Sequence, residues 1–175
     1  TSTAKVISDD LQLHENNKKK TDNSINIEID NLTKPSDFIK LRAETDSVAL
    51  KKKFSNKDIY KNNLPTNPSS RSLYKIAEKI RYECLGGKML KGIEKNFNEN
   101  YKEIINRTRK EKLRNKEDVA VTEAFELYML KNFHHIELNT LTRRMLNFWE
   151  KDFEKSIDKH KKFLQDNLDN QQQYS

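Results

Sequence analysis

Apolar residues recur at helical spacing through the middle of the chain. Those at positions 73, 76, 77, 80 and 84 share one face of a helix, and from Leu85 apolar residues continue every fourth position to Ile105. The pattern crosses three glycines without interruption. It predicts one helix, or two nearly continuous helices, over Leu73–Phe97. No other stretch stays apolar along one face for so long, so we expect this helix to be central.

The same spacing predicts three further helices around it. The first begins at Thr33–Pro35, where threonine can cap and proline suits the first turn, and fades near Phe54. The second covers about residues 118–132, and the third begins near Thr140. The residues expected to face inward are Phe38, Leu41, Thr45 and Val48 in the first helix; Val121, Ala124, Phe125, Tyr128 and Phe133 in the second; and Leu141, Met145, Phe148, Trp149, Phe153 and Ile157 in the third. Apolar faces on four helices predict a mainly α fold, a helix bundle.

The two ends of the chain have different patterns. Near the start, Ile25, Ile27 and Ile29 alternate with polar residues, which with the earlier "AKVIS" predicts a small N-terminal β hairpin. The final "DNLDNQQQYS" is polar and typical of disorder or a linker. We therefore predict a hairpin with a polar, partly flexible loop at 1–33, a helical domain at 34–165, and a polar tail at 166–175 that leads to a linker.

Composition limits the cellular compartments and the kinds of partner that suit this chain. The net charge is +7, and lysine supplies most of the positive charge. Lysine is a hydrated point charge without the planar fork that arginine uses for bidentate recognition, which favours loose electrostatic contacts or solubility. The single cysteine, Cys84, permits no internal disulfide, and no apolar run approaches the ~20 residues of a membrane span. We expect a cytoplasmic protein with no membrane partner.

Glycine occurs only in "CLGGKMLKG", residues 84–92. A P-loop needs a preceding strand, four residues between its glycines, and a following Lys and Ser or Thr. Here Gly86 and Gly87 are adjacent, Gly92 follows five residues later, and the preceding segment is helical. Small residues allow close helix approach, so we expect Gly86 and Gly92 to face a neighbouring helix.

The remaining candidate chemistry is weak. His134 and His135 point about 100° apart on a helix and do not suit one metal ion, so the pair more simply ends a helix. Cys84 lies on the apolar face, as a structural thiol does. Enzymatic use of the histidines stays open as a minor alternative.

A basic segment leaves a further alternative open. Residues 71–116 carry fourteen Lys or Arg and six Asp or Glu, interleaved with aromatic residues. The alternative function is a basic, helical, nucleic-acid-associated module. Because the aromatic residues lie on or near the apolar face, we consider nucleic acid an unlikely partner.

The segment "LYKIAEKIRYECLGGKMLKGIEKNF" resembles the N-terminal region of CobT, a subunit of aerobic, ATP-dependent cobaltochelatase. The motif is an Arg-x-Glu step, a turn of small residues, basic residues, Met, Gly and then Asn. Its residues are Arg81, Glu83, Gly86, Lys88, Met89, Gly92, Ile93 and Asn96. The resemblance extends over about residues 36–175, through Arg42, Asp46, Ala49, Leu50 and Leu64. The chain is richer in Lys, Asn and Ile than the family pattern, and it contains no Asp-x-Ser-x-Ser metal-site segment.

The resemblance implies a non-catalytic assembly or coupling region that supports ATP-dependent cobalt insertion into a corrin ring. The implied partners are an AAA+ ATPase subunit (CobS-like) and a large corrinoid-binding subunit (CobN-like). The implied complex uses ATP, Mg²⁺ and cobalt, whereas we expect this chain to bind no cofactor or metal and to have no catalytic residues. Lys88, Lys91 and Lys95 recur at spacings of three and four, which predicts one helix face, and they are the candidate partner-binding residues.

Overall fold

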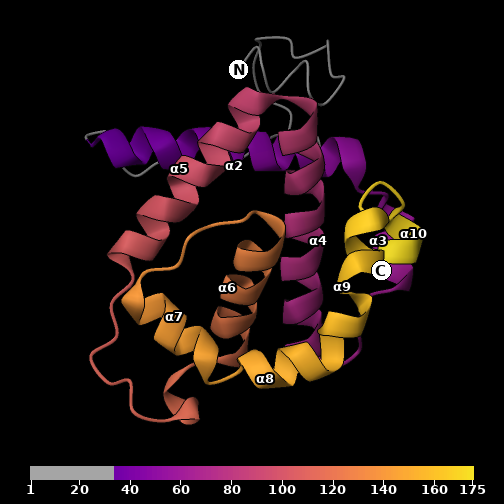
Figure 1. The fold of residues 1–175 in the computed structure, drawn as a ribbon. Helices are drawn as coiled ribbons and strands as arrows, with labels where there is room; N and C mark the ends of the chain where they lie inside the picture. Colours follow the sequence, from indigo (N-terminus) through magenta and orange to yellow (C-terminus); the bar gives the residue numbers. More distant parts are fainter. Residues whose placement is uncertain (1–33) are drawn as a thin grey trace, which may run out of the picture.

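The protein is built almost entirely from helices (Figure 1). This computed structural model describes residues 34–175, and the predicted hairpin at 1–33 lies outside the described residues. Within the described part there is no strand, so the mainly α class is confirmed. The elements are α2 (Pro35–Phe54), α3 (Lys57–Asn62), α4 (Pro68–Met89), α5 (Lys91–Arg107), the 3₁₀ turn η1 (Lys116–Asp118), α6 (Val121–Phe133), α7 (Thr140–Asn147), α8 (Glu150–Phe153), the π-helical η2 (Glu154–Asp158), α9 (Lys159–Asp166) and α10 (Gln171–Tyr174).

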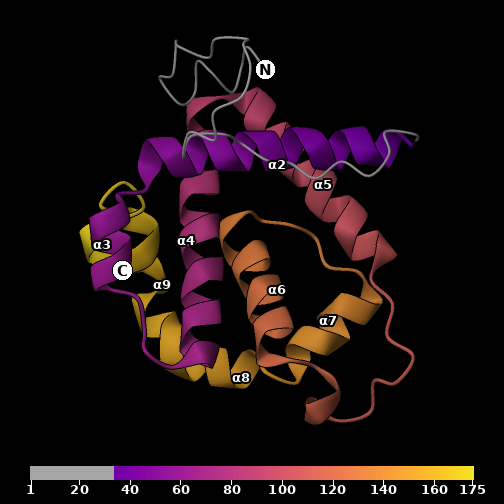
Figure 2. The ribbon, with the colours of Figure 1, turned by 180° about the vertical axis from the view of Figure 1, so that it is seen from behind.

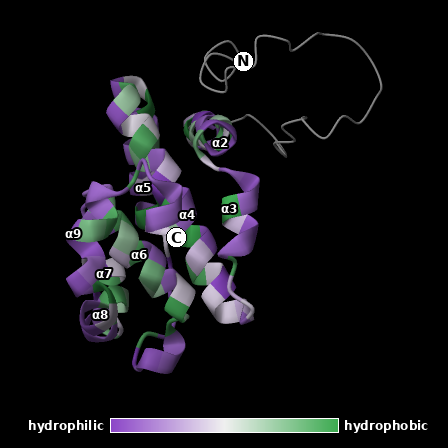
Figure 3. Cartoon of the chain, turned by 90° about the vertical axis from the view of Figure 1, so that its right-hand side faces the viewer, coloured by the Kyte–Doolittle hydropathy of each residue, from purple (hydrophilic) through white to green (hydrophobic). Residues whose placement is uncertain are grey.

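Helix α4 is the central element, as predicted. Five consecutive residues, 80–84, are buried, which on a helix means that neighbours cover it on every side. Helices α2, α5 and α6 pack against it, and α2 crosses α4 and α5 close to the corner that joins them (Figures 1 and 2). Hydrophobic and hydrophilic residues alternate along the helices (Figure 3), as amphipathic packing requires. Asn67, rather than Ser69 or Ser70, caps α4 by accepting from both serine amides.

Of the two forms predicted for Leu73–Phe97, the single helix is wrong, and the structure has two helices separated by one residue. Leu90 adopts an extended conformation (φ −141°, ψ 116°) between α4 and α5, and the chain turns sharply there (Figure 1). The apolar spacing nevertheless survives, since Ile93 and Phe97 are buried. Both helices pack against the same core, so apolar periodicity continues although the chain changes direction.

The predicted inner face of α2 is also wrong. Phe38 and Val48 are exposed, whereas Ala43, Asp46 and Leu50 are among the buried residues. The buried face of α2 meets α4 and α5 through two alanines, through Leu50 against Gly86, and through Asp46, which accepts from Asn96. The apolar spacing over positions 38–48 therefore marked a different face from the one that packs.

The helix predicted at 118–132 is confirmed as α6, with four of its five predicted inward residues buried. The helix predicted from Thr140 is interrupted instead: α7 ends before Phe148, and α8 begins after Trp149. The interruption lets aromatic rings cluster, since Phe153 lies 5.6 Å from Phe125 and 5.4 Å from Tyr128 between ring centroids. The indole nitrogen of Trp149 donates to the Val119 carbonyl at 3.0 Å.

The polar tail at 166–175 is ordered against the bundle, which corrects the expectation of disorder. Leu168, Gln171 and Tyr174 are buried, and the Tyr174 hydroxyl donates to the Ala77 carbonyl of α4 at 3.1 Å. Here the polar residues act as hydrogen-bonding partners of the helices they meet. Amino-acid composition shows that these residues are polar, but it does not show which residues they form hydrogen bonds with.

Candidate functional site

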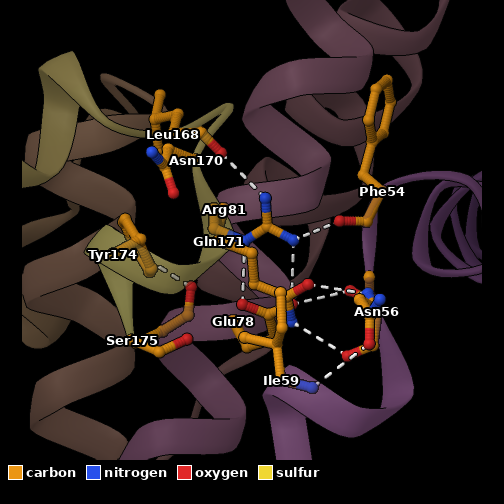
Figure 4. A network of polar contacts seen from close by, with 12 residues as sticks. Phe54, Asn56, Ile59, Glu78, Arg81, Leu168, Asn170, Gln171, Tyr174 and Ser175 are labelled. Carbon is orange, nitrogen blue, oxygen red and sulfur yellow. Dashed lines mark hydrogen bonds and ion pairs between the residues drawn. The ribbon is translucent and has the colours of Figure 1, made fainter.

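Arg81, the first residue of the predicted motif, is completely buried in α4 and joins three segments. Its guanidinium donates to both carboxylate oxygens of Glu78, at 2.8 and 2.9 Å. It also donates to the carbonyl of Phe54 at the end of α2 and, at 2.8 Å, to the carbonyl of Leu168 (Figure 4). A bidentate pair of this kind satisfies both buried charges, so Arg81 is a structural residue.

Glu78 extends the same network toward the end of the chain. Its Oε1 accepts from the hydroxyl of Ser55 at 2.6 Å and from the side-chain amide of Gln171 at 2.9 Å. The backbone amide of Asn56 in turn donates to Gln171 Oε1 at 2.6 Å (Figure 4). The C-terminal segment is therefore bonded both to α4 and to the link between α2 and α3.

Glu83, the second charged residue of the motif, binds three different helices. Its carboxylate accepts from the hydroxyl of Ser47 in α2 at 2.6 Å and from the hydroxyl of Tyr101 in α5. His134, at the end of α6, places Nε2 3.6 Å from Glu83 Oε2. Burial alone raises the pKa of Glu83, but bonds led by that from His134 outweigh it and hold the pKa below its usual value.

His134 carries the complementary charge. Burial lowers its pKa, but contacts with Cys84 and Glu83 outweigh burial and raise the pKa to about 9. Burial also raises the pKa of Tyr101 well above its usual value, so its hydroxyl keeps the proton that it donates to Glu83. The cluster is a buried ion pair with hydrogen-bonding support from α2 and α5.

Cys84 lies in the core and His134 lies at a helix end, as predicted. Cys84 is buried, with its Sγ 3.7 Å from the Phe133 carbonyl and 3.8 Å from His134 Nε2. His134 is the residue that terminates α6, and the exposed His135 follows at a positive φ of 55°. Among the described residues, no group of three or more His, Cys, Asp or Glu side chains is placed to hold a metal ion.

Asn96 and Gly86 position α2 across the α4–α5 pair. The Asn96 side-chain amide donates to Asp46 Oδ2 at 2.7 Å, and burial raises the pKa of Asp46 despite that bond. Gly86 faces Leu50 of α2 so closely that an added Cβ would lie 2.3 Å from Leu50 Cδ1. The expected close packing is therefore confirmed at Gly86.

Gly92 does not share that role. A Cβ added to Gly92 would have no neighbour within 4 Å in the described part of the chain, so the expectation that it faces another of these helices is wrong. The break at Leu90 explains this, because it places Gly92 in the exposed first turn of α5. Met89, at the end of α4, is likewise exposed. The motif thus has a buried structural part and an exposed part.

The three candidate partner-binding lysines, Lys88, Lys91 and Lys95, are all exposed, but they do not lie on one helix face. Lys88 belongs to α4 and the other two to α5, on opposite sides of the break. Lys95 pairs with Glu99 at 3.8 Å. Within residues 34–175, Lys88 and Lys91 form no ion pair, and Lys91 and Lys95 line a shallow open hollow beside α5.

Sequence reasoning identified Arg81 and Glu83 but missed the residues that hold them. The spacing of three between Glu78 and Arg81 is the one local signal, since such pairs meet on a helix. Gln171 lies 93 residues from its partner Glu78. His134 is likewise distant in sequence from Glu83, so no local pattern could reveal either contact.

Comparison with known proteins identifies a family. The family model described as "Cobalamin biosynthesis protein CobT" matches residues 1–175, which is the whole chain. No curated protein and no solved structure matches. None of the helices described here is both long and apolar enough to cross a membrane.

Proposed function

The chain belongs to the CobT family of cobalamin biosynthesis proteins, and from this membership we propose that it is a non-catalytic assembly and coupling region of a cobaltochelatase. In this proposal it lies in the cytoplasm between an AAA+ ATPase subunit and a large corrinoid-binding subunit. Those subunits use ATP, Mg²⁺ and cobalt to insert the cobalt ion into a corrin ring. This chain supplies binding surfaces to that reaction.

The observation that carries the proposal is how the motif's charged side chains are used. Arg81 and Glu83 are buried, and their polar atoms bind α2, α5, α6 and the C-terminal segment of the same chain. Residues committed to such contacts fix the relative positions of helices. A firmly held helical platform is what a subunit needs when it passes work between an ATPase and its client.

The contact with the ATPase subunit is proposed at Lys88, Lys91 and Lys95. Lys88 and Lys91 form no ion pair within the described residues, and Lys95 pairs with Glu99. The three exposed lysines therefore leave positive charge that attracts an acidic surface and accelerates its association. The nucleic-acid alternative gains no support, because Tyr82, Phe97 and Tyr101 are buried in the core and cannot stack on bases.

Co-expression of the chain with the ATPase subunit, followed by size-exclusion chromatography at moderate salt, tests the proposal. We expect co-elution of the two proteins. The charge-reversal variant K88E/K91E/K95E should weaken it, whereas K155E/K159E/K162E, which reverses three other exposed lysines, should not. Clean separation of the unaltered proteins would refute the partner. Co-elution that both variants leave unchanged would refute the site alone.

A further inference from the structure

The corner between α4 and α5, residues 88–92, exposes apolar side chains that no described helix covers. It lies beyond α2 in both Figure 1 and Figure 2. Met89 and Leu90 are 40% and 43% exposed, and they are the only consecutive pair among the exposed large hydrophobic residues of the described part. The others there are Phe38, Val48, Ile104 and Phe163. Exposed apolar side chains such as Met89 and Leu90 lower solubility and add nothing to the core.

Gly92 is a second, independent observation at the same corner. Its φ is not positive, and no atom of the described residues 34–175 lies within 4 Å of an added Cβ. Neither backbone conformation nor internal packing therefore requires glycine there. Glycine also loses more conformational freedom than alanine when it is fixed in a helix. An exposed glycine without a Cβ allows another molecule to approach the backbone closely.

The charge at the corner indicates which kind of molecule approaches. Lys88 and Lys91 flank the apolar pair, and Lys95 and Lys102 continue along α5. Two acidic residues, Glu94 and Glu99, lie among them and leave an excess of positive charge. The first turn of α5 has no side-chain cap, so its backbone amides add a partial positive charge.

We infer that this corner is the anchor of the partner-binding surface. Met89 and Leu90 insert into an apolar pocket on an acidic protein surface, and the rim of that pocket approaches Gly92. The inference rests on the proposed function, in which the acidic partner is the ATPase subunit. Apolar residues supply the central contact, and the lysines around them supply orientation and association rate.

Titration calorimetry of the chain against the purified ATPase subunit tests the inference. The variants M89S/L90S and G92L should each bind at least ten-fold more weakly than the unaltered chain. I104S/F163S is the matched control, because these residues are 50% and 47% exposed at other places, and it should bind normally. Urea unfolding of each variant should show stability close to that of the unaltered chain.

The outcomes separate the two proposals. If the unaltered chain does not bind the ATPase subunit, both are refuted. If it binds and the corner variants bind equally well, only the corner is refuted. A large loss of stability in M89S/L90S would show that the chain itself covers the pair, and a dimer of the unaltered chain that these variants dissolve would show a second copy there. Either result overturns the inference.

Discussion

Substitution of Gly86 by alanine tests the close packing of α2 on α4 with a single methyl group. The new Cβ would lie 2.3 and 2.6 Å from the two Cδ atoms of Leu50 and 3.0 Å from its Cγ. Leu50 is fully buried, so it cannot swing into solvent. Overpacking typically costs about 1–3 kcal/mol, and the gain in helix propensity returns about 1 kcal/mol. We expect a net loss of up to roughly 2 kcal/mol, and a larger loss, in the upper part of that overpacking range, for G86L.

Urea unfolding followed by circular dichroism measures the effect, and Gly92 provides the matched control. G92A meets no neighbour among the residues that the structure describes and should be neutral or slightly stabilising. L50A alone opens a cavity and should cost about 2–5 kcal/mol. In the double variant G86A/L50A, the Leu50 side chain that would clash with the new methyl is absent. The combined loss of stability should therefore be smaller than the sum of the two single losses by about 1 kcal/mol or more. A stabilised G86A, or strict additivity with L50A, would refute the packing argument.

Three other predictions concern buried charge and the absence of nucleotide chemistry. R81M should lose roughly 3–5 kcal/mol of unfolding free energy, because it leaves the Glu78 carboxylate buried without its charged partner. R143M, at an exposed arginine, is the control. A loss below about 1 kcal/mol in R81M would contradict the buried network. Since the pKa of His134 is raised to about 9 in the folded chain, its stabilising contribution is full below the unfolded pKa of about 6.5 and is lost as pH rises through about 9. That contribution is of the order of 3 kcal/mol, and H134Q should remove this pH dependence from the unfolding free energy; equal slopes in both proteins would refute the pairing with Glu83. The isolated chain should neither bind nor hydrolyse ATP in calorimetry and phosphate-release assays, and turnover that disappears in K88A would overturn that expectation.

Much of the fold was predictable because helical periodicity is a local property. The apolar faces of α5 and α6, the central place of α4 and the mainly α class all follow from spacing along the chain. The motif of Arg81, Glu83, Gly86 and Asn96 was also visible in the sequence. The match over residues 1–175 confirms that the chain belongs to the CobT family.

The wrong predictions share a physical cause, which is that local sequence patterns do not record the tertiary contacts of a segment. Periodicity does not record direction, so the single extended residue Leu90 could redirect the helix without disturbing the pattern. The apolar spacing marked the wrong face of α2, because the face that packs includes two alanines and Asp46. Polarity made the tail look disordered, although Gln171 completes a buried network.

The sequence by itself determined the mainly α class, the apolar faces of α5 and α6, and the family. Only the tertiary structure decided which charges are structural and which stay at the surface. Arg81 and Glu83 became structural when α2, α6 and the C-terminal segment closed around α4. Lys88 and Lys91 stay at the surface on the two sides of the break at Leu90. The physical reason is that the partner of a buried charge lies tens of residues away, and its position depends on how helices pack.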